Sequence, residues 1–142
     1  MAAVKKLVGA YLIIVAVLVA MFFIINTFLL DSLDVPSVWS VLNVFMLIGL
    51  ALSLIHNYFR KRAMDAAEDG GALNRAYFEA NAAFYVTAGV TILFHNWFSL
   101  LAQGSNYLDG NHQAWIIWAT VDTLLPIMLG ITGCHVWRSA QE

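Results

Sequence analysis

The chain has 142 residues, of which 61% are hydrophobic and only 11% are charged. A soluble domain carries about a quarter charged residues and roughly half apolar ones, so this composition excludes a soluble enzyme, a disordered protein and a nucleic-acid-binding protein. The mean hydropathy of +0.76 predicts an integral membrane protein instead. At this length we expect one domain that covers residues 1–142. The single cysteine, Cys134, excludes an internal disulfide and a thiol oxidoreductase that needs paired cysteines.

Four apolar stretches are long enough to cross a bilayer, which takes about 20 helical residues. They cover about residues 7–30, 38–59, 78–101 and 115–137. Each stretch is apolar on all sides, unlike an amphipathic helix that lies on a membrane surface, and none shows the alternating pattern of a β-barrel strand. Short connections make successive helices antiparallel neighbours. The sequence therefore predicts an all-α integral membrane fold, an up-down bundle of four transmembrane helices.

The basic residues determine the expected topology. All seven fall on one side of a four-span chain: Lys5, Lys6, Arg60, Lys61, Arg62, Arg75 and Arg138. Basic residues concentrate on the cytoplasmic side of a membrane, so both termini are expected in the cytoplasm. Because the first stretch is longer than the core of a signal peptide, we interpret it as a retained helix. The expected location is the bacterial inner (plasma) membrane, with an organelle membrane as the alternative.

Local signals predict both ends of the second helix. Pro36 or Ser37 is expected to start it, because proline suits the first helical position. The helix is expected to continue past residue 59 into the cytoplasm, through the segment RKRAMDAAED, until Gly70 and Gly71 break it. No connection is long enough to fold as a soluble domain, so any function is expected within the membrane.

One acidic residue, Asp122, lies inside a predicted span. It comes seven residues after Trp115, on the order of 10 Å deeper in the membrane, and no basic residue lies within a span to pair with it. Pro126, four residues later, cannot donate to the carbonyl group of residue 122. Four polar residues at similar depth in the other helices could donate to the carboxyl group: His95, Asn96, Asn43 and Asn26.

This polar intramembrane cluster has two interpretations. Polar side chains that bond across helices hold a bundle together, at ~0.6 kcal/mol per bond, and we favour this structural role. The alternative is a proton-linked or ligand-binding site built from Asp122 and His95, as in a small proton-coupled transporter or channel. On the third helix, a repeat of alternating four and three residues predicts one buried packing stripe. The stripe comprises Asn81, Tyr85, Ala88, Ile92, His95 and Ser99.

A pair of histidines suggests a cofactor. His56 and His135 lie about 20 residues into the second and fourth helices, which run in the same direction, so the two side chains are expected at matching depth. Two axial histidines could hold a b-type haem, with Gly49 leaving room for the macrocycle. No metal site is predicted, since Asp122 and His95 supply only two ligands.

No catalytic motif stands out in the sequence. The preferred hypothesis is a small non-catalytic subunit that packs against a larger inner-membrane complex of a respiratory, photosynthetic or monooxygenase type, with an assembly or stabilising role. Small residues such as Gly49 and Ser53, or Gly130 and Gly133, permit close helix approach. Expected partners are bound membrane lipids and either other membrane subunits or further copies of the chain, and no nucleic acid. A haem b-binding electron-transfer subunit is the alternative, and the transporter or channel a further one.

Overall fold

The computed structural model describes residues 2–28, 34–67, 75–101 and 110–141. Its helices, in chain order, are α1 (Ala2–Ile25), the short 3-10 helix η1 (Asn26–Phe28), α2 (Val35–Ala67), α3 (Arg75–Leu101) and α4 (His112–Arg138). No strand occurs within the described ranges. The predicted all-α fold is therefore confirmed.

Three of these helices, α1, α2 and α4, are long and apolar enough to cross a membrane. This agrees with the predicted membrane location. In the described part of the chain α3 is not among them, because polar residues such as Asn81, His95 and Asn96 interrupt its apolar sequence. The span predicted over residues 78–101, and with it the four-span bundle, is therefore not confirmed.

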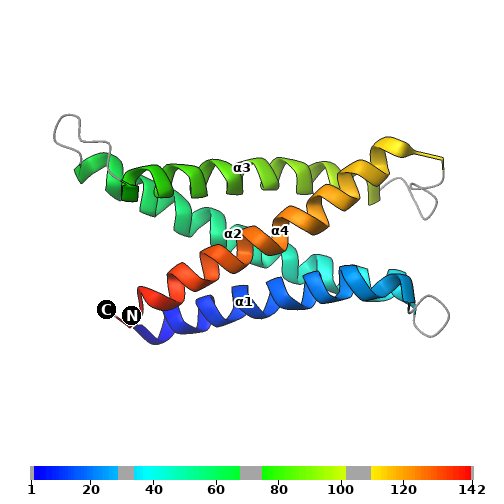
Figure 1. Cartoon of the computed structure of the whole chain (residues 1–142), viewed down its shortest axis with the longest axis horizontal. Coiled ribbons are helices and arrows are strands. Elements are labelled where there is room, and N and C mark those ends of the chain that lie inside the picture. Colours follow the sequence, from blue (N-terminus) through cyan, green and yellow to red (C-terminus); the bar gives the residue numbers. More distant parts are fainter. Residues whose placement is uncertain (1, 29–33, 68–74, 102–109, 142) are drawn as a thin grey trace.

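The four helices form a ring of contacts. α1 packs along α4, α4 against α3, α3 against α2 and α2 against α1, while α2 and α4 also meet. Figure 1 shows α2 and α4 crossing in the middle of the molecule, with α1 and α3 on opposite sides. The two termini lie at the same end (Figure 1), where Lys5 Nζ donates to the carbonyl oxygen of Ser139 at 3.4 Å. Both ends of the chain thus lie on one side of the molecule.

Glycines allow α1 and α4 to approach closely. A Cβ atom on Gly9 would lie 2.9 Å from the backbone nitrogen of Trp137 and 3.0 Å from the carbonyl oxygen of Gly133. A Cβ atom on Gly133 would lie 2.9 Å from side-chain atoms of Leu12 and Ile13. Carbon atoms prefer a separation of about 3.5–4.0 Å, so neither position accepts a side chain without movement of a helix. The close approach expected at Gly133 is therefore found, and α1 is the helix that approaches.

A buried hydrogen-bond network joins α2, α3 and α4. Asn57 Nδ2 on α2 donates to Thr87 Oγ1 on α3 at 2.8 Å and to Thr132 Oγ1 on α4 at 3.2 Å. The three residues are at most 4% exposed. Thr87 Oγ1 in turn donates to the carbonyl oxygen of Ala83 at 2.7 Å. A buried polar group without a hydrogen-bond partner is costly in an apolar interior, so this network determines the relative positions of α2, α3 and α4.

The second helix begins slightly earlier than predicted. α2 starts at Val35, one residue before the proline that was expected to begin it. The reason is the side chain of Asp34, which accepts hydrogen bonds from the backbone nitrogen of Ser37 at 3.3 Å and from its hydroxyl group. The predicted extension of the helix beyond residue 59 is confirmed as far as Ala67, whereas the two glycines expected to break it lie outside the described residues.

The buried face of α3 differs from the predicted stripe. Tyr85 and Ile92 are 61% and 65% exposed, and His95 and Ser99 are exposed as well. The buried residues of α3 are instead Ala80, Thr87, Val90, Phe94 and Trp97. The prediction treated polar residues as markers of a packing seam, but such groups can bond locally, as Ser99 Oγ does to the carbonyl oxygen of His95 at 3.2 Å. The predicted stripe is wrong, and most of it faces outward.

Candidate functional site

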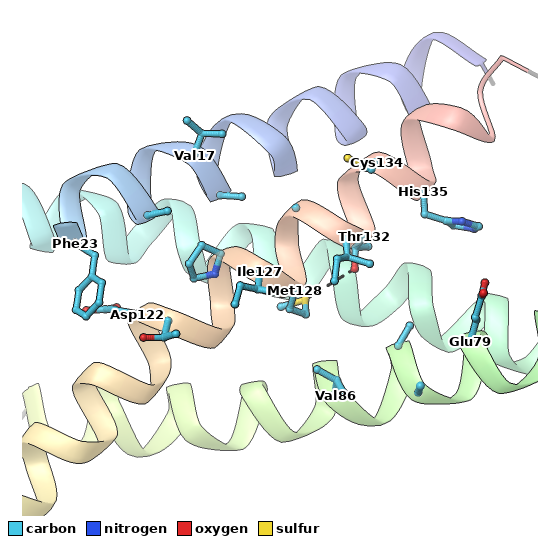
Figure 2. Close-up of a pocket in the computed structure, with 18 of the residues that line it drawn as sticks. Val17, Phe23, Glu79, Val86, Asp122, Ile127, Met128, Thr132, Cys134 and His135 are labelled. Atoms are coloured by element: carbon cyan, nitrogen blue, oxygen red, sulfur yellow. Dashed lines mark hydrogen bonds between the residues drawn. The ribbon is translucent and has the colours of Figure 1, made fainter. Parts of the chain in front are cut away.

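A cavity of 1020 Å³ lies between α1, α3 and α4. It exists because α1 and α3 both pack on α4 but not appreciably on each other. Figure 2 shows side chains from these helices around it. Its walls are mainly apolar, and lining residues such as Val17, Val86 and Ile127 are more than half exposed. The cavity is therefore an apolar groove that is open along the side of the molecule.

Ionisable side chains line the end of the cavity near the chain termini. They are Arg60, Glu79, His135 and Arg138, and Figure 2 shows Glu79 and His135 projecting from α3 and α4 toward the same space. Glu79 Oε1 accepts a hydrogen bond from Arg75 Nε at 2.7 Å, and Glu79 Oε2 lies 3.8 Å from Arg60 Nη2. One carboxylate thus meets two guanidinium groups, and Arg138 adds a further positive charge.

Asp122 lines the opposite end of the cavity. It is 1% exposed, and neither carboxyl oxygen has a hydrogen-bond partner among the described residues. The neighbouring hydroxyl groups bond within their own helix, since Thr123 Oγ1 donates to Ala119 O at 2.7 Å and Thr120 Oγ1 to Ile116 O at 2.6 Å. A buried charge without a partner costs several kcal/mol, so a neutral carboxylic acid fits this environment.

Asn43 lies at the depth of Asp122 on the parallel helix α2. Ring contacts establish the register of α2 and α4: the ring centroids of Trp39 and Trp118 are 6.3 Å apart and those of His56 and His135 are 5.6 Å apart. Both pairs are separated by 79 residues (118 minus 39, and 135 minus 56), and so are Asn43 and Asp122 (122 minus 43). Asn43 is 6% exposed, and its Oδ1 has no partner within the described ranges.

The structure divides the predicted polar cluster. It buries Asn26, Asn43 and Asp122 and leaves His95 and Asn96 exposed on α3. A layer of aromatic rings lies one helical turn from Asn43 and Asp122, where α2 and α4 meet α1. In this layer the ring centroids of Phe22 and Trp39 are 5.1 Å apart and those of Phe23 and Trp118 are 5.3 Å apart. Asn26 follows these rings at the start of η1, directly after α1, and α1 runs in the opposite direction to α2 and α4 (Figure 1). The aromatic layer therefore lies between Asn26 and the other two residues.

The two histidines of the haem hypothesis lie side by side. Their rings are 5.6 Å apart and inclined at 55°, and His56 Nε2 is buried without a partner among the described residues. The space beside Gly49, however, is filled, because a Cβ atom there would lie 3.2 Å from both methyl carbons of Leu129. A macrocycle at this position requires that Leu129 move, so haem binding by this pair remains a prediction.

Sequence reasoning missed the charged end of the cavity. From the sequence, Arg60 and Arg138 orient the chain and could pair with the propionates of a haem, and Glu79 is expected to pair with Arg75 in the first turn of its helix, which the structure confirms. The sequence did contain a signal that the two arginines lie close in depth. Arg60 and Arg138 are separated by 78 residues (138 minus 60), and the histidines His56 and His135 by 79 (135 minus 56). On parallel helices this spacing places both guanidinium groups at one depth.

The cavity has mainly apolar walls and polar groups at its two ends. Within the described ranges, no group of three or more His, Cys, Asp or Glu residues is placed to hold a metal ion. The cavity offers an apolar wall, a cluster of guanidinium groups at one end and an unpartnered carboxyl group at the other. A scan against protein-family models found no match, and searches of curated proteins and of solved structures found none either.

Proposed function

We propose that the chain is a small four-span membrane protein, with both termini in the cytoplasm of a bacterium, that packs laterally against a larger inner-membrane complex. It would have no catalytic activity of its own and would stabilise or help assemble a respiratory, photosynthetic or monooxygenase-type complex. The observation that carries the proposal is the outward face of α3, where His95, Asn96 and Ser99 are exposed.

The depth of these residues supports a protein partner. Asn57 bonds to both Thr87 and Thr132, so these threonines lie at one level of the molecule. His95 comes eight residues after Thr87 on α3, and Asp122 comes ten residues before Thr132 on α4. Because α3 and α4 run in opposite directions, both residues lie toward the same end of the molecule, about 12 and 15 Å from the level of the threonines. His95 is thus nearly as far from the cytoplasmic end as Asp122, and a polar side chain at that depth is costly against lipid.

Gly89 provides a test of this interface. It lies on α3, and a Cβ atom there would have no neighbouring atom within 4 Å, so Gly89→Phe should not disturb the isolated chain. If α3 packs against a partner, the new side chain should displace the protein from its complex, as seen by native gel electrophoresis of mild-detergent extracts. The matched control is Ala51→Phe on α2, which also enlarges a small exposed residue.

Two results would contradict the proposal. One is that Gly89→Phe and Ala51→Phe remain in a complex to the same extent. The other is that the unmodified protein migrates at the size of the isolated chain at its natural expression level. Circular dichroism of both purified variants would establish that the substituted chains still fold.

Haem binding is a second candidate, favoured by the adjacent rings of His56 and His135. The absorption spectrum of the purified protein tests it directly. A Soret band that disappears in His56→Ala and in His135→Ala would establish an electron-transfer subunit. A colourless preparation from cells supplied with haem would eliminate this candidate. Transport through Asp122 and His95 has weaker support, because one residue is buried and the other is exposed.

A further inference from the structure

The lateral cavity is long enough to hold a lipid acyl chain. The sixteen residue steps from Asp122 to Arg138 extend about 24 Å along α4, whereas one leaflet of the hydrocarbon core is about 15 Å thick. The apolar lining residues Val17, Val86 and Ile131 are between 54% and 64% exposed in the isolated chain. In a bilayer this open apolar groove is in contact with acyl chains from the side.

The charge at the end of the cavity selects the head group. Arg60 and Arg138 both line this end. Glu79 also lines it, but its carboxylate already accepts a hydrogen bond from Arg75 at 2.7 Å and lies 3.8 Å from Arg60. The three arginines and one glutamate leave an excess of positive charge at this end of the cavity. Basic pockets between helices on the cytoplasmic side are suited to anionic lipid head groups.

We propose that the cavity between α1, α3 and α4 binds a phospholipid with a net negative head group. Its phosphate lies between Arg60 and Arg138, and an acyl chain extends along α4 toward Pro126. An isolated phosphate ion would leave the apolar walls uncovered, and an apolar helix of a partner would leave the arginines without a counter-charge. A phospholipid covers the apolar walls with its acyl chain and supplies the arginines with a counter-charge. Asp122 lies beyond the reach of its head group.

Native mass spectrometry of the purified full-length chain tests this proposal. The chain is titrated with phosphatidylglycerol and, separately, with phosphatidylcholine that carries the same acyl chains. We expect phosphatidylglycerol to bind at least about tenfold more tightly, since each arginine near a head group of net negative charge contributes about fivefold, whereas the choline cation of phosphatidylcholine offsets the charge of its phosphate. The double variant Arg60→Gln/Arg138→Gln should remove this preference. Arg62→Gln should preserve it, because Arg62 is exposed on the same helix and does not line the cavity.

The position of the lipid is tested separately. Val86→Trp fills the cavity and should weaken binding of both lipids about tenfold or more, whereas Ile92→Trp, also exposed on α3 but outside the cavity, should leave binding unchanged. If the double variant does not fold, Arg138→Gln alone replaces it in the test of lipid preference, because Arg138 is an exposed residue near the chain terminus. An excess of inorganic phosphate should not displace the lipid.

Four results would overturn the proposal. They are equal affinity for the two lipids, an equal loss of preference in Arg62→Gln, unchanged lipid binding in Val86→Trp, and displacement of phosphatidylglycerol by inorganic phosphate. The last result would indicate a site for free phosphate, and the third would indicate that the lipid binds elsewhere on the chain.

Discussion

The contact between α1 and α4 should be the most sensitive point of the fold to added volume. In Gly9→Ala the new methyl group would lie 2.9 Å from Trp137 N, 3.0 Å from Gly133 O and 3.1 Å from Trp137 Cα. All three are backbone atoms, so no side-chain rotation relieves the overlap and the helices must separate. Overpacking of this kind costs about 1–3 kcal/mol, and replacing glycine by alanine in a helix returns about 0.5–1 kcal/mol.

The net expectation for Gly9→Ala is a loss of up to about 2.5 kcal/mol in the free energy of unfolding. Unfolding in mixed micelles with increasing SDS, followed by circular dichroism, measures this quantity. Gly89→Ala is the matched control, because its methyl group meets no atom within 4 Å and should gain up to about 1 kcal/mol. A spin label on the native Cys134, paired with a second on Leu7→Cys, should report a longer α1–α4 distance in Gly9→Ala. Equal stability of the two alanine variants with an unchanged label distance would refute the assigned helix contact.

Two further substitutions test the buried polar groups. Asn57→Leu removes two hydrogen bonds between helices, to Thr87 and Thr132, and should lower the free energy of unfolding by about 1 kcal/mol. The control Asn81→Leu loses only a hydrogen bond within α3, to Tyr77 O, and should change the free energy of unfolding less. Equal effects of the two substitutions would mean that the network does not join the helices. Asp122→Leu removes a carboxyl group without a described partner and should raise the free energy of unfolding by about 1–3 kcal/mol. A marked fall in the same SDS titration would instead show that the carboxyl group bonds across helices, as the structural interpretation of the cluster requires.

The charges and the lengths of the apolar stretches were informative in the sequence itself. Uninterrupted apolar runs predicted helices where α1, α2 and α4 occur, and the extension of α2 through residues 60–67 followed from a segment without helix breakers. Backbone groups in lipid must bond within their own segment, so a long apolar run leaves a helix as its one local solution. The equal spacing of His56 and His135 along parallel helices likewise placed the two side chains at one depth.

The orientation of each helix about its own axis was decided by the tertiary structure. The polar stripe predicted to be buried on α3 faces outward, and Thr87 and Phe94 are buried instead. Gly9, which carried no signal in the sequence, is the residue that meets Gly133. The cavity arises from the separation of α1 and α3, which no segment of either helix predicts.

The physical reason lies in the solvent. In water, hydrophobic periodicity identifies the inner face of a helix, because the other face must be polar. In a bilayer both the interior and the surroundings are apolar, so helix packing depends on close approach, shape and a few hydrogen bonds. These quantities become defined only when the helices meet. The sequence therefore determined that the chain forms long apolar helices and where its charges lie, whereas packing alone decided which charges and which apolar walls enclose one cavity.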